Sequence, residues 1–274
     1  MLKRIALVAA CLYGSPAGAW ENTSCPAVTQ STLQSALKSA ISQVHGQLGL
    51  GLNMWATIVA SDGKVCLVAN SSDDAIQGQW LASRVISAQK AFTAATLSLG
   101  PTPNSGSNSK YANGRLALST ANLYSAVQPG GSLYGLATSN PVAVPEAYGE
   151  RDDSPAFTGA YGTVNDPMVG QIIGGINVFG GGLALYAKGG TKVGGLGVSG
   201  ATSCTDHLIA WNTRHNLGLD HLGSINGVSG DTQRPDNIVF DIGAPQPSGW
   251  GHPACGYSNA DATSAAAALP AVSK

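Results

Sequence analysis

The chain has 274 residues, of which 11% are charged, and its formal net charge is -1 at pH 7. This composition excludes a protein that holds nucleic acid or an anionic membrane surface through a basic field, because basic residues do not outnumber acidic ones. Glycine occurs 36 times while aromatic residues make up 6% of the chain, so turns and close backbone contacts are expected to occupy much of one large domain.

The first 19 residues have the pattern of a secretory signal peptide. A basic start, Lys3-Arg4, precedes an apolar run over 5–13, and Ala17-Gly18-Ala19 matches the small-residue pattern of a cleavage site. The run is too short to span a bilayer, and no amphipathic pattern supports the alternative of a buried first helix. We therefore expect a mature protein that begins at Trp20, is periplasmic or secreted, and is not inserted in a membrane.

Five cysteines are present, and Cys11 belongs to the predicted signal peptide. The even number left, Cys25, Cys66, Cys204 and Cys255, predicts two disulfides in an oxidising compartment. Cys25 and Cys255 lie near the two ends of the mature chain, so we expect them to pair and to leave Cys66 with Cys204. The two other connectivities stay open. No C-x-x-C-H motif occurs, which excludes covalent haem attachment of the c type.

The first half of the chain predicts two helices around a hairpin. Apolar residues recur at three- and four-residue steps over 29–48, which is typical of an amphipathic helix. Strands are expected over 55–59 and 64–69, because Asp62-Gly63 between them is a strong hairpin signal. A second helix is expected over 79–97.

The glycine-rich part of the second half predicts another hairpin followed by a helix. Strands are expected over 176–185 and 192–198, and the short linker Lys188-Gly189-Gly190 allows little except a tight turn. Both strands carry glycines where a β-carbon would hinder a neighbouring backbone or a ligand. A helix over 206–216 follows, with a polar cluster at 202–207 that can cap it.

The remaining segments are less regular. The segment over 100–113 is a loop, 116–126 is expected to be a helix, and 141–173 reads as a long surface insertion without a sustained period. A short strand is expected over 238–242. The Ala- and Ser-rich tail from 258 onward is expected to be disordered.

Four motifs in this order resemble the GlcG/HbpS family of haem-binding proteins, and within it the C-terminal domain of PduO-type cobalamin adenosyltransferases. The resemblance covers roughly 29–140 and 174–218, and it leaves out the insertion and the C-terminal part. The residues that carry it are Gln89-Lys90-Ala91-Phe92-Thr93-Ala94-Ala95, Val127-Gln128-Pro129-Gly130-Gly131-Ser132-Leu133-Tyr134-Gly135-Leu136, Val178-Phe179-Gly180-Gly181-Gly182-Leu183, Gly197-Val198-Ser199-Gly200 and Asp206.

The resemblance implies a fold of the α/β (α+β) class, with a small antiparallel sheet of about five strands flanked by helices. We expect a signal peptide over 1–19, a single domain over 20–245 that carries a long loop insertion, and a partly disordered C-terminal extension over 246–274. The resemblance also implies assembly into a homo-oligomer. It implies haem as the cofactor, with a corrinoid as the less favoured alternative.

Two histidines are candidates for the axial ligand of the haem iron, because neutral imidazole is the commonest such donor. His207 is the first choice, since it follows the glycine-rich hairpin, and His45 is the second. Lys90 is a candidate partner for a haem propionate. The competing interpretation is a solvated helix residue for His207 and Lys90, and for His45 a cap at the end of the first helix that is favoured by the helix dipole. The further candidate contacts to the cofactor are Tyr134, Gly180, Gly181, Gly182 and Ser199.

The predicted function is that of an exported haem-binding protein that holds, buffers or delivers haem outside the cytoplasm. Two alternatives stay open: a small-molecule enzyme of the isomerase or lyase type on the same fold, and an interaction subunit of an exported complex. Binding is favoured over catalysis. Ser199 in particular lacks the G-x-S-x-G spacing of a hydrolase nucleophile.

Overall fold

A computed structural model describes residues 24–44, 48–100, 115–149, 159–242, 248–255 and 262–274. The predicted signal peptide, His45 and the loop over 101–113 lie outside these ranges. Within them, no helix is both long enough and apolar enough to cross a bilayer.

A four-stranded antiparallel sheet forms the centre of the fold. Its strands follow the order β2-β1-β5-β4, and the two predicted hairpins are confirmed, since β1 pairs with β2 and β4 pairs with β5. The predicted small antiparallel sheet flanked by helices is confirmed. It has four strands, and a further ladder in the described residues is a separate parallel pair, β3-β6. The strands are β1 (Trp55–Val59), β2 (Val65–Asn70), β3 (Leu116–Ala117), β4 (Gly182–Ala187), β5 (Thr191–Ser199) and β6 (Asn226–Gly227).

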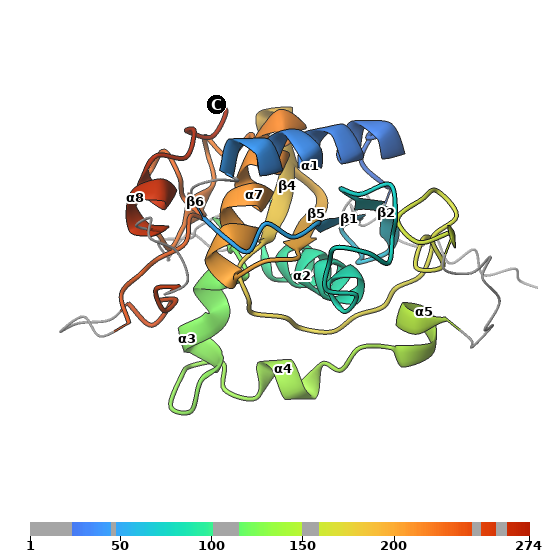
Figure 1. Ribbon diagram of the computed structural model, residues 1–274. Coiled ribbons are helices and arrows are strands. Elements are labelled where there is room, and N and C mark those ends of the chain that lie inside the picture. Colours follow the sequence, from blue (N-terminus) through green and yellow to red (C-terminus); the bar gives the residue numbers. More distant parts are fainter. Residues whose placement is uncertain (1–23, 45–47, 101–114, 150–158, 243–247, 256–261) are drawn as a thin grey trace, which may run out of the picture.

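Helices cover both faces of this sheet. α2 (Ser83–Leu97) packs on one face against β1, β4 and β5, whereas α1 (Gln30–Val44) and α7 (Ser203–Asn216) pack together on the other face. Figure 1 shows the strands between α2 below and the α1–α7 pair above. The predicted helices over 29–48, 79–97 and 206–216 are therefore confirmed in type and order.

The side chains of β1 contribute to two apolar cores, one on each face of the sheet. Trp55 and Val59 belong to the apolar cluster beneath α2, while Ala56 and Ile58 belong to the larger cluster beneath α1 and α7. This alternation follows from the two-residue period of a strand. Thr57 also faces α2, where its hydroxyl lies 2.7 Å from that of Ser87.

The glycines of β5 let α2 lie directly against the strand. A Cβ atom at Gly195 would overlap the Ala91 carbonyl oxygen, and one at Gly197 would overlap the Ser87 carbonyl oxygen. The helix presents small residues on this face, among them Ala91 and Ala95. The glycines thus accommodate the backbone of the chain's own helix.

The predicted helix over 116–126 is wrong for its first five residues, whereas its second half, from Ala121 on, is helical. Leu116 and Ala117 pair with β6, and the Thr120 N–H donates to the carbonyl oxygen of Gly182, so this segment lies along the sheet before it turns into short helices. The shorter helices of the fold are η2 (Ala121–Leu123), α3 (Tyr124–Val127), α4 (Leu136–Ser139), α5 (Val144–Tyr148), η3 (Lys188–Gly190) and α8 (Ala262–Ala267).

The described parts of the 141–173 insertion are packed onto the sheet rather than lying free on the surface. Ala147, Met168 and Ile173 are fully buried in the apolar cluster beneath α2. The backbone also continues the sheet edge, because Val65 exchanges hydrogen bonds with Gly170 and Gln171.

The C-terminal predictions need two corrections. The expected strand over 238–242 is absent, because its backbone N–H groups bond to side chains instead, Ile238 to His207 and Val239 to Asn122. The tail over 262–274 is ordered, and its Leu269 and Val272 join the larger core. The sequence pattern missed this because alanine and small residues lack a strong period.

The disulfides are Cys25–Cys66 and Cys204–Cys255, so the expected connectivity is wrong. That expectation assumed that the two ends of the mature chain meet. Instead, each bond joins an end of the domain to the element beside it: Cys25 precedes α1 and reaches β2, and Cys204 in the first turn of α7 reaches the C-terminal segment.

The close contact between α2 and β5 generates a stability prediction. Replacing Gly197→Ala should lower the free energy of unfolding by about 3 kcal/mol or more, because overpacking a rigid contact forces backbone shifts. Gly159→Ala is the matched control, since its Cβ would meet open space. Urea unfolding compares the two variants, and equal stability would contradict the packing role of Gly197.

The disulfide pattern generates a chemical prediction. The exported protein should begin at Trp20 and contain no free thiol, so native protein should take up no label from a thiol-alkylating reagent. Peptide mapping without reduction should recover Cys25 linked to Cys66 and Cys204 linked to Cys255. A single alkylated cysteine in the native protein, or a crossed peptide pair, would contradict it.

Candidate functional site

Most of the predicted site residues meet where α7 begins. We call this region the α7 junction: the start of α7, the glycines at 180–182, Lys90 of α2, and the C-terminal segments 236–241 and 251–255 that pack against them. In Figure 1 the start of α7 lies close to α3 and the sheet. The region is densely packed, as the following contacts show.

Gly180, Gly181 and Gly182 are buried by the protein's own atoms. Added Cβ atoms would overlap the Ser203 carbonyl oxygen, the Val198 carbonyl oxygen and the Thr120 side chain, respectively. Gly181 also has φ +113°, a conformation that L side chains rarely adopt. These glycines allow α7 and β5 to approach, and in this packing they leave no open backbone for a flat ligand.

Lys90 and Asp206 form a buried ion pair. The Lys90 ammonium lies 2.7 Å from Asp206 Oδ2 and also donates to the Val198 carbonyl oxygen at 3.0 Å. Burial raises the pKa of Asp206 to about 6, an effect that the Lys90 charge opposes, and burial likewise lowers the pKa of Lys90. The pair fixes α2 to α7, and Lys90 therefore has an internal partner in place of a propionate.

His207 lies inside the junction with 0% of its surface exposed. Its Nε2 accepts a hydrogen bond from the Ile238 N–H at 3.1 Å and lies 3.1 Å from Asn237 Oδ1. Its Nδ1 is buried and has no hydrogen-bond partner in the described residues. Burial lowers the pKa of His207 to about 4, so the ring is neutral at physiological pH. To bind iron through Nε2, His207 would have to give up its hydrogen bond with Ile238 of the C-terminal segment.

A second histidine of the junction bonds to a serine. Ser203, the first residue of α7, has its Oγ 2.7 Å from His252 Nε2, and His252 Nδ1 lies 2.7 Å from the Pro253 carbonyl oxygen. The Gly180 N–H donates to the same Oγ at 2.5 Å. Burial lowers the pKa of His252, with a smaller contribution from the positive charge of Lys90.

Cys204, His252 and Cys255 bring three potential metal-binding atoms within 4.8 Å of one another. The two sulfur atoms are bonded to each other in the disulfide. Metal ions bind the thiolate form of cysteine, so this group acts as a covalent clamp and not as a metal centre.

The remaining three predicted contacts to the cofactor have different surroundings. Ser199 is buried in β5 beside Trp55 of β1. Tyr134, in contrast, is 69% exposed. His45 lies outside the described residues. Each of these three assignments as a cofactor contact stays a prediction.

His215 offers an imidazole at the protein surface. It lies in the last turn of α7, and its Nδ1 is 2.7 Å from the carboxylate of buried Asp220. Its side chain is 41% exposed. A carboxylate that holds one ring nitrogen fixes the orientation of the ring, which is the usual support of a metal-binding histidine.

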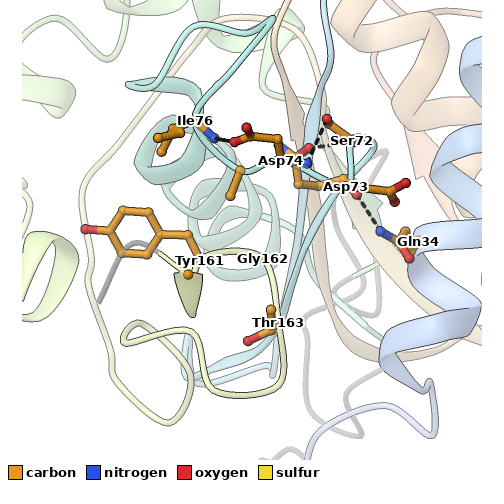
Figure 2. A pocket seen from close by; sticks show the side chains of 11 residues that line it. Gln34, Ser72, Asp73, Asp74, Ile76, Tyr161, Gly162 and Thr163 are labelled. Carbon is orange, nitrogen blue, oxygen red and sulfur yellow. Dashed lines mark hydrogen bonds between the residues drawn. The ribbon is translucent and has the colours of Figure 1, made fainter. Parts of the chain in front are cut away.

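A polar cleft of about 510 Å³ lies on another side of the molecule, between β2, α1 and the insertion. Figure 2 shows Tyr161 across from Gln34, with Asp73 and Asp74 on the loop between them. The Asp74 carboxylate accepts the Ile76 N–H at 2.9 Å, and Asp73 lies 3.6 Å from Lys38. No histidine or cysteine belongs to the described lining of this cleft.

The sequence reasoning missed the partners that complete the junction. Ser203 was considered only as a capping residue, and Asn237 and His252 lie beyond the stretch that resembles the family. The one available signal was the spacing of His252 and Cys255, since a disulfide to Cys204 brings both next to the start of α7.

The comparisons define the class of protein. The family model described as haem degrading protein HbpS-like matches residues 28–213. The chain belongs to this HbpS-like family, and the predicted resemblance is confirmed. No functionally curated protein shows significant similarity to the chain.

Three solved structures illustrate the similarity. The ORFY protein of Klebsiella pneumoniae is 22% identical, with 72% of this chain and 96% of that chain covered and a TM-score of 0.40. PduOC, solved as a haem complex, is 20% identical, with 70% and 95% covered and a TM-score of 0.42. A double mutant of HbpS from Streptomyces reticuli is 17% identical, with 78% and 99% covered and a TM-score of 0.40.

The buried ion pair generates a prediction with a pH dependence. Lys90→Met should lower the free energy of unfolding at pH 7.5 by about 3–5 kcal/mol, because it leaves the Asp206 carboxylate buried and unpaired. Removing the Lys90 charge raises the folded-state pKa of Asp206 further above its unfolded value. Since the carboxyl of the variant takes up its proton at a higher pH than that of the parent, the loss should shrink as the pH falls from 7.5 to about 6 and should change little below 6.

Urea unfolding at several pH values measures this effect. The double variant Lys90→Met/Asp206→Asn should recover part of the stability at pH 7.5. Lys38→Met is the control, because its ion pair with Asp73 is exposed and such pairs contribute less than about 1 kcal/mol. A loss that is the same at pH 4 and pH 7.5 would contradict the assignment.

Proposed function

We propose that this protein is an exported haem-binding protein that holds or delivers haem outside the cytoplasm. The observation that carries the proposal is its membership of the HbpS-like family, over 28–213. Export is supported by the signal-peptide pattern of 1–19 and by two disulfides, which persist in oxidising compartments. The division into a domain over 20–245 with an extension over 246–274, and assembly into a homo-oligomer, belong to the same proposal.

The donor set of the chain fits a haem bound at the surface better than one enclosed in the α7 junction. The junction holds neutral His207 with a free Nδ1, but its ring is enclosed and its Nε2 is engaged. Among the described histidines, His215 combines an exposed ring with a carboxylate partner. We therefore place His215 beside the sequence-derived candidates His207 and His45 as a ligand to the haem iron.

Haem, once bound, would supply the redox and oxygen chemistry of its iron, and the protein would supply the axial donor. Asp220 would hold the proton on His215 Nδ1 and so keep Nε2 available. A surface site buries little apolar area, so a micromolar dissociation constant is expected.

Titration of the purified mature protein with haemin tests the proposal. The parent should develop a shifted Soret band, and His215→Gln should weaken or shift it. His221→Gln, which changes a partly exposed histidine next to Asp220, should leave it unchanged. His207→Gln and His45→Gln decide between the ligand candidates in the same assay. A parent protein that takes up no haem would overturn the proposal, and a matching titration with cobalamin tests the corrinoid alternative.

A further inference from the structure

We propose that Ser203 and His252 form a nucleophile–base pair that transfers acyl groups from small esters to water, at a site that does not depend on haem. The serine Oγ lies 2.7 Å from His252 Nε2, and the Pro253 carbonyl oxygen lies 2.7 Å from His252 Nδ1. A nucleophile, a base within hydrogen-bond reach and a third group that orients the base recur in hydrolases of unrelated folds.

The proton positions follow from the hydrogen bonds. A carbonyl oxygen only accepts, so His252 Nδ1 carries the proton that it donates to Pro253. A neutral ring then has a lone pair on Nε2, and the Ser203 hydroxyl donates to it. Burial lowers the pKa of His252 and favours this neutral form. The hydroxyl proton is thus already directed toward its base.

Two features favour negative charge on the serine oxygen. The Gly180 N–H donates to Ser203 Oγ at 2.5 Å, so a backbone dipole lowers the cost of removing the hydroxyl proton. Ser203 is also the first residue of the 14-residue helix α7, whose N-terminus carries partial positive charge. Both contributions are preorganised, since they come from the backbone.

The surroundings separate the base from water and leave the nucleophile partly open. His252 is buried, with the Tyr124 ring at 5.3 Å and the Phe240 ring at 6.4 Å between centroids. Ser203 itself is partly exposed, and Phe179, next to Gly180, exposes half of its surface. The half-exposed apolar ring of Phe179 beside the nucleophile favours short, apolar acyl esters as the substrate class.

The disulfide Cys204–Cys255 holds the pair together. It joins the residue after Ser203 to a residue three positions after His252. This bond links the part of the chain that matches the family to the extension that does not. The base is therefore supplied by the extension, outside the 28–213 match.

The reaction balances as ester plus water giving acid plus alcohol. Ser203 Oγ attacks the carbonyl carbon while its proton moves to His252 Nε2, and the C–O bond to the alcohol breaks as that proton passes to the leaving oxygen. Water then attacks the acyl-serine and gives a proton to His252. The acid departs, and the proton returns to Ser203 Oγ.

A fluorophosphonate probe and p-nitrophenyl acetate test the proposal on the disulfide-intact, haem-free protein. The parent should be labelled at Ser203, as located by peptide mapping, and should hydrolyse the ester. Ser203→Ala should abolish labelling, and His252→Gln, which retains a polar side chain, should reduce labelling and hydrolysis by roughly 100-fold or more. Circular dichroism and disulfide mapping check that both variants are folded.

The matched controls are Ser42→Ala, an exposed serine of α1, and His221→Gln, and both should behave like the parent. Equal labelling of Ser203→Ala and the parent would overturn the proposal. So would a parent that neither labels nor hydrolyses the ester, in which case Ser203 and His252 only anchor the start of α7. Because the assay contains no haem, its outcome is independent of the haemin titration.

Discussion

The close contact between α2 and β5 is the constraint on which the rest of the structure depends. The missing Cβ atoms of Gly195 and Gly197 let the helix backbone lie on the strand. This proximity sets the reach of Lys90, whose ammonium extends from α2 to Asp206 of α7. α7, on the opposite face of the sheet, is therefore held in position relative to α2 by a buried ion pair as well as by apolar packing.

The segments added to this core are attached by the same kind of interaction. Arg84 of α2 binds Asp166 of the insertion, and Arg214 of α7 binds Asp236 of the C-terminal segment with two hydrogen bonds of 2.6 and 2.9 Å. All four side chains are buried. Breaking such a pair lowers the free energy of unfolding, because the remaining buried charge is left without a partner. Each segment therefore has one defined position on the core.

Periodicity and turn chemistry were enough to predict the sheet and its three main helices, because these elements bury one face with a regular spacing. The same reasoning could not predict the segment 116–120, whose backbone bonds to β4 and β6, or the segment 238–242, whose N–H groups bond to His207 and Asn122. Those partners are distant in sequence. The glycines at 180–182 were identified as a place of close approach, but the approaching groups, Ser203 of α7, Val198 of β5 and Thr120, follow only from the fold.

The disulfide connectivity has a consequence for how the protein acquires its covalent structure. Cys25 pairs with Cys66, and Cys204 pairs with Cys255, so the two bonds neither cross nor enclose one another. Any chain that meets an oxidant from its N-terminus onward would present these four cysteines in the order in which they pair. Joining consecutive cysteines therefore gives the native pattern without a later exchange of bonds.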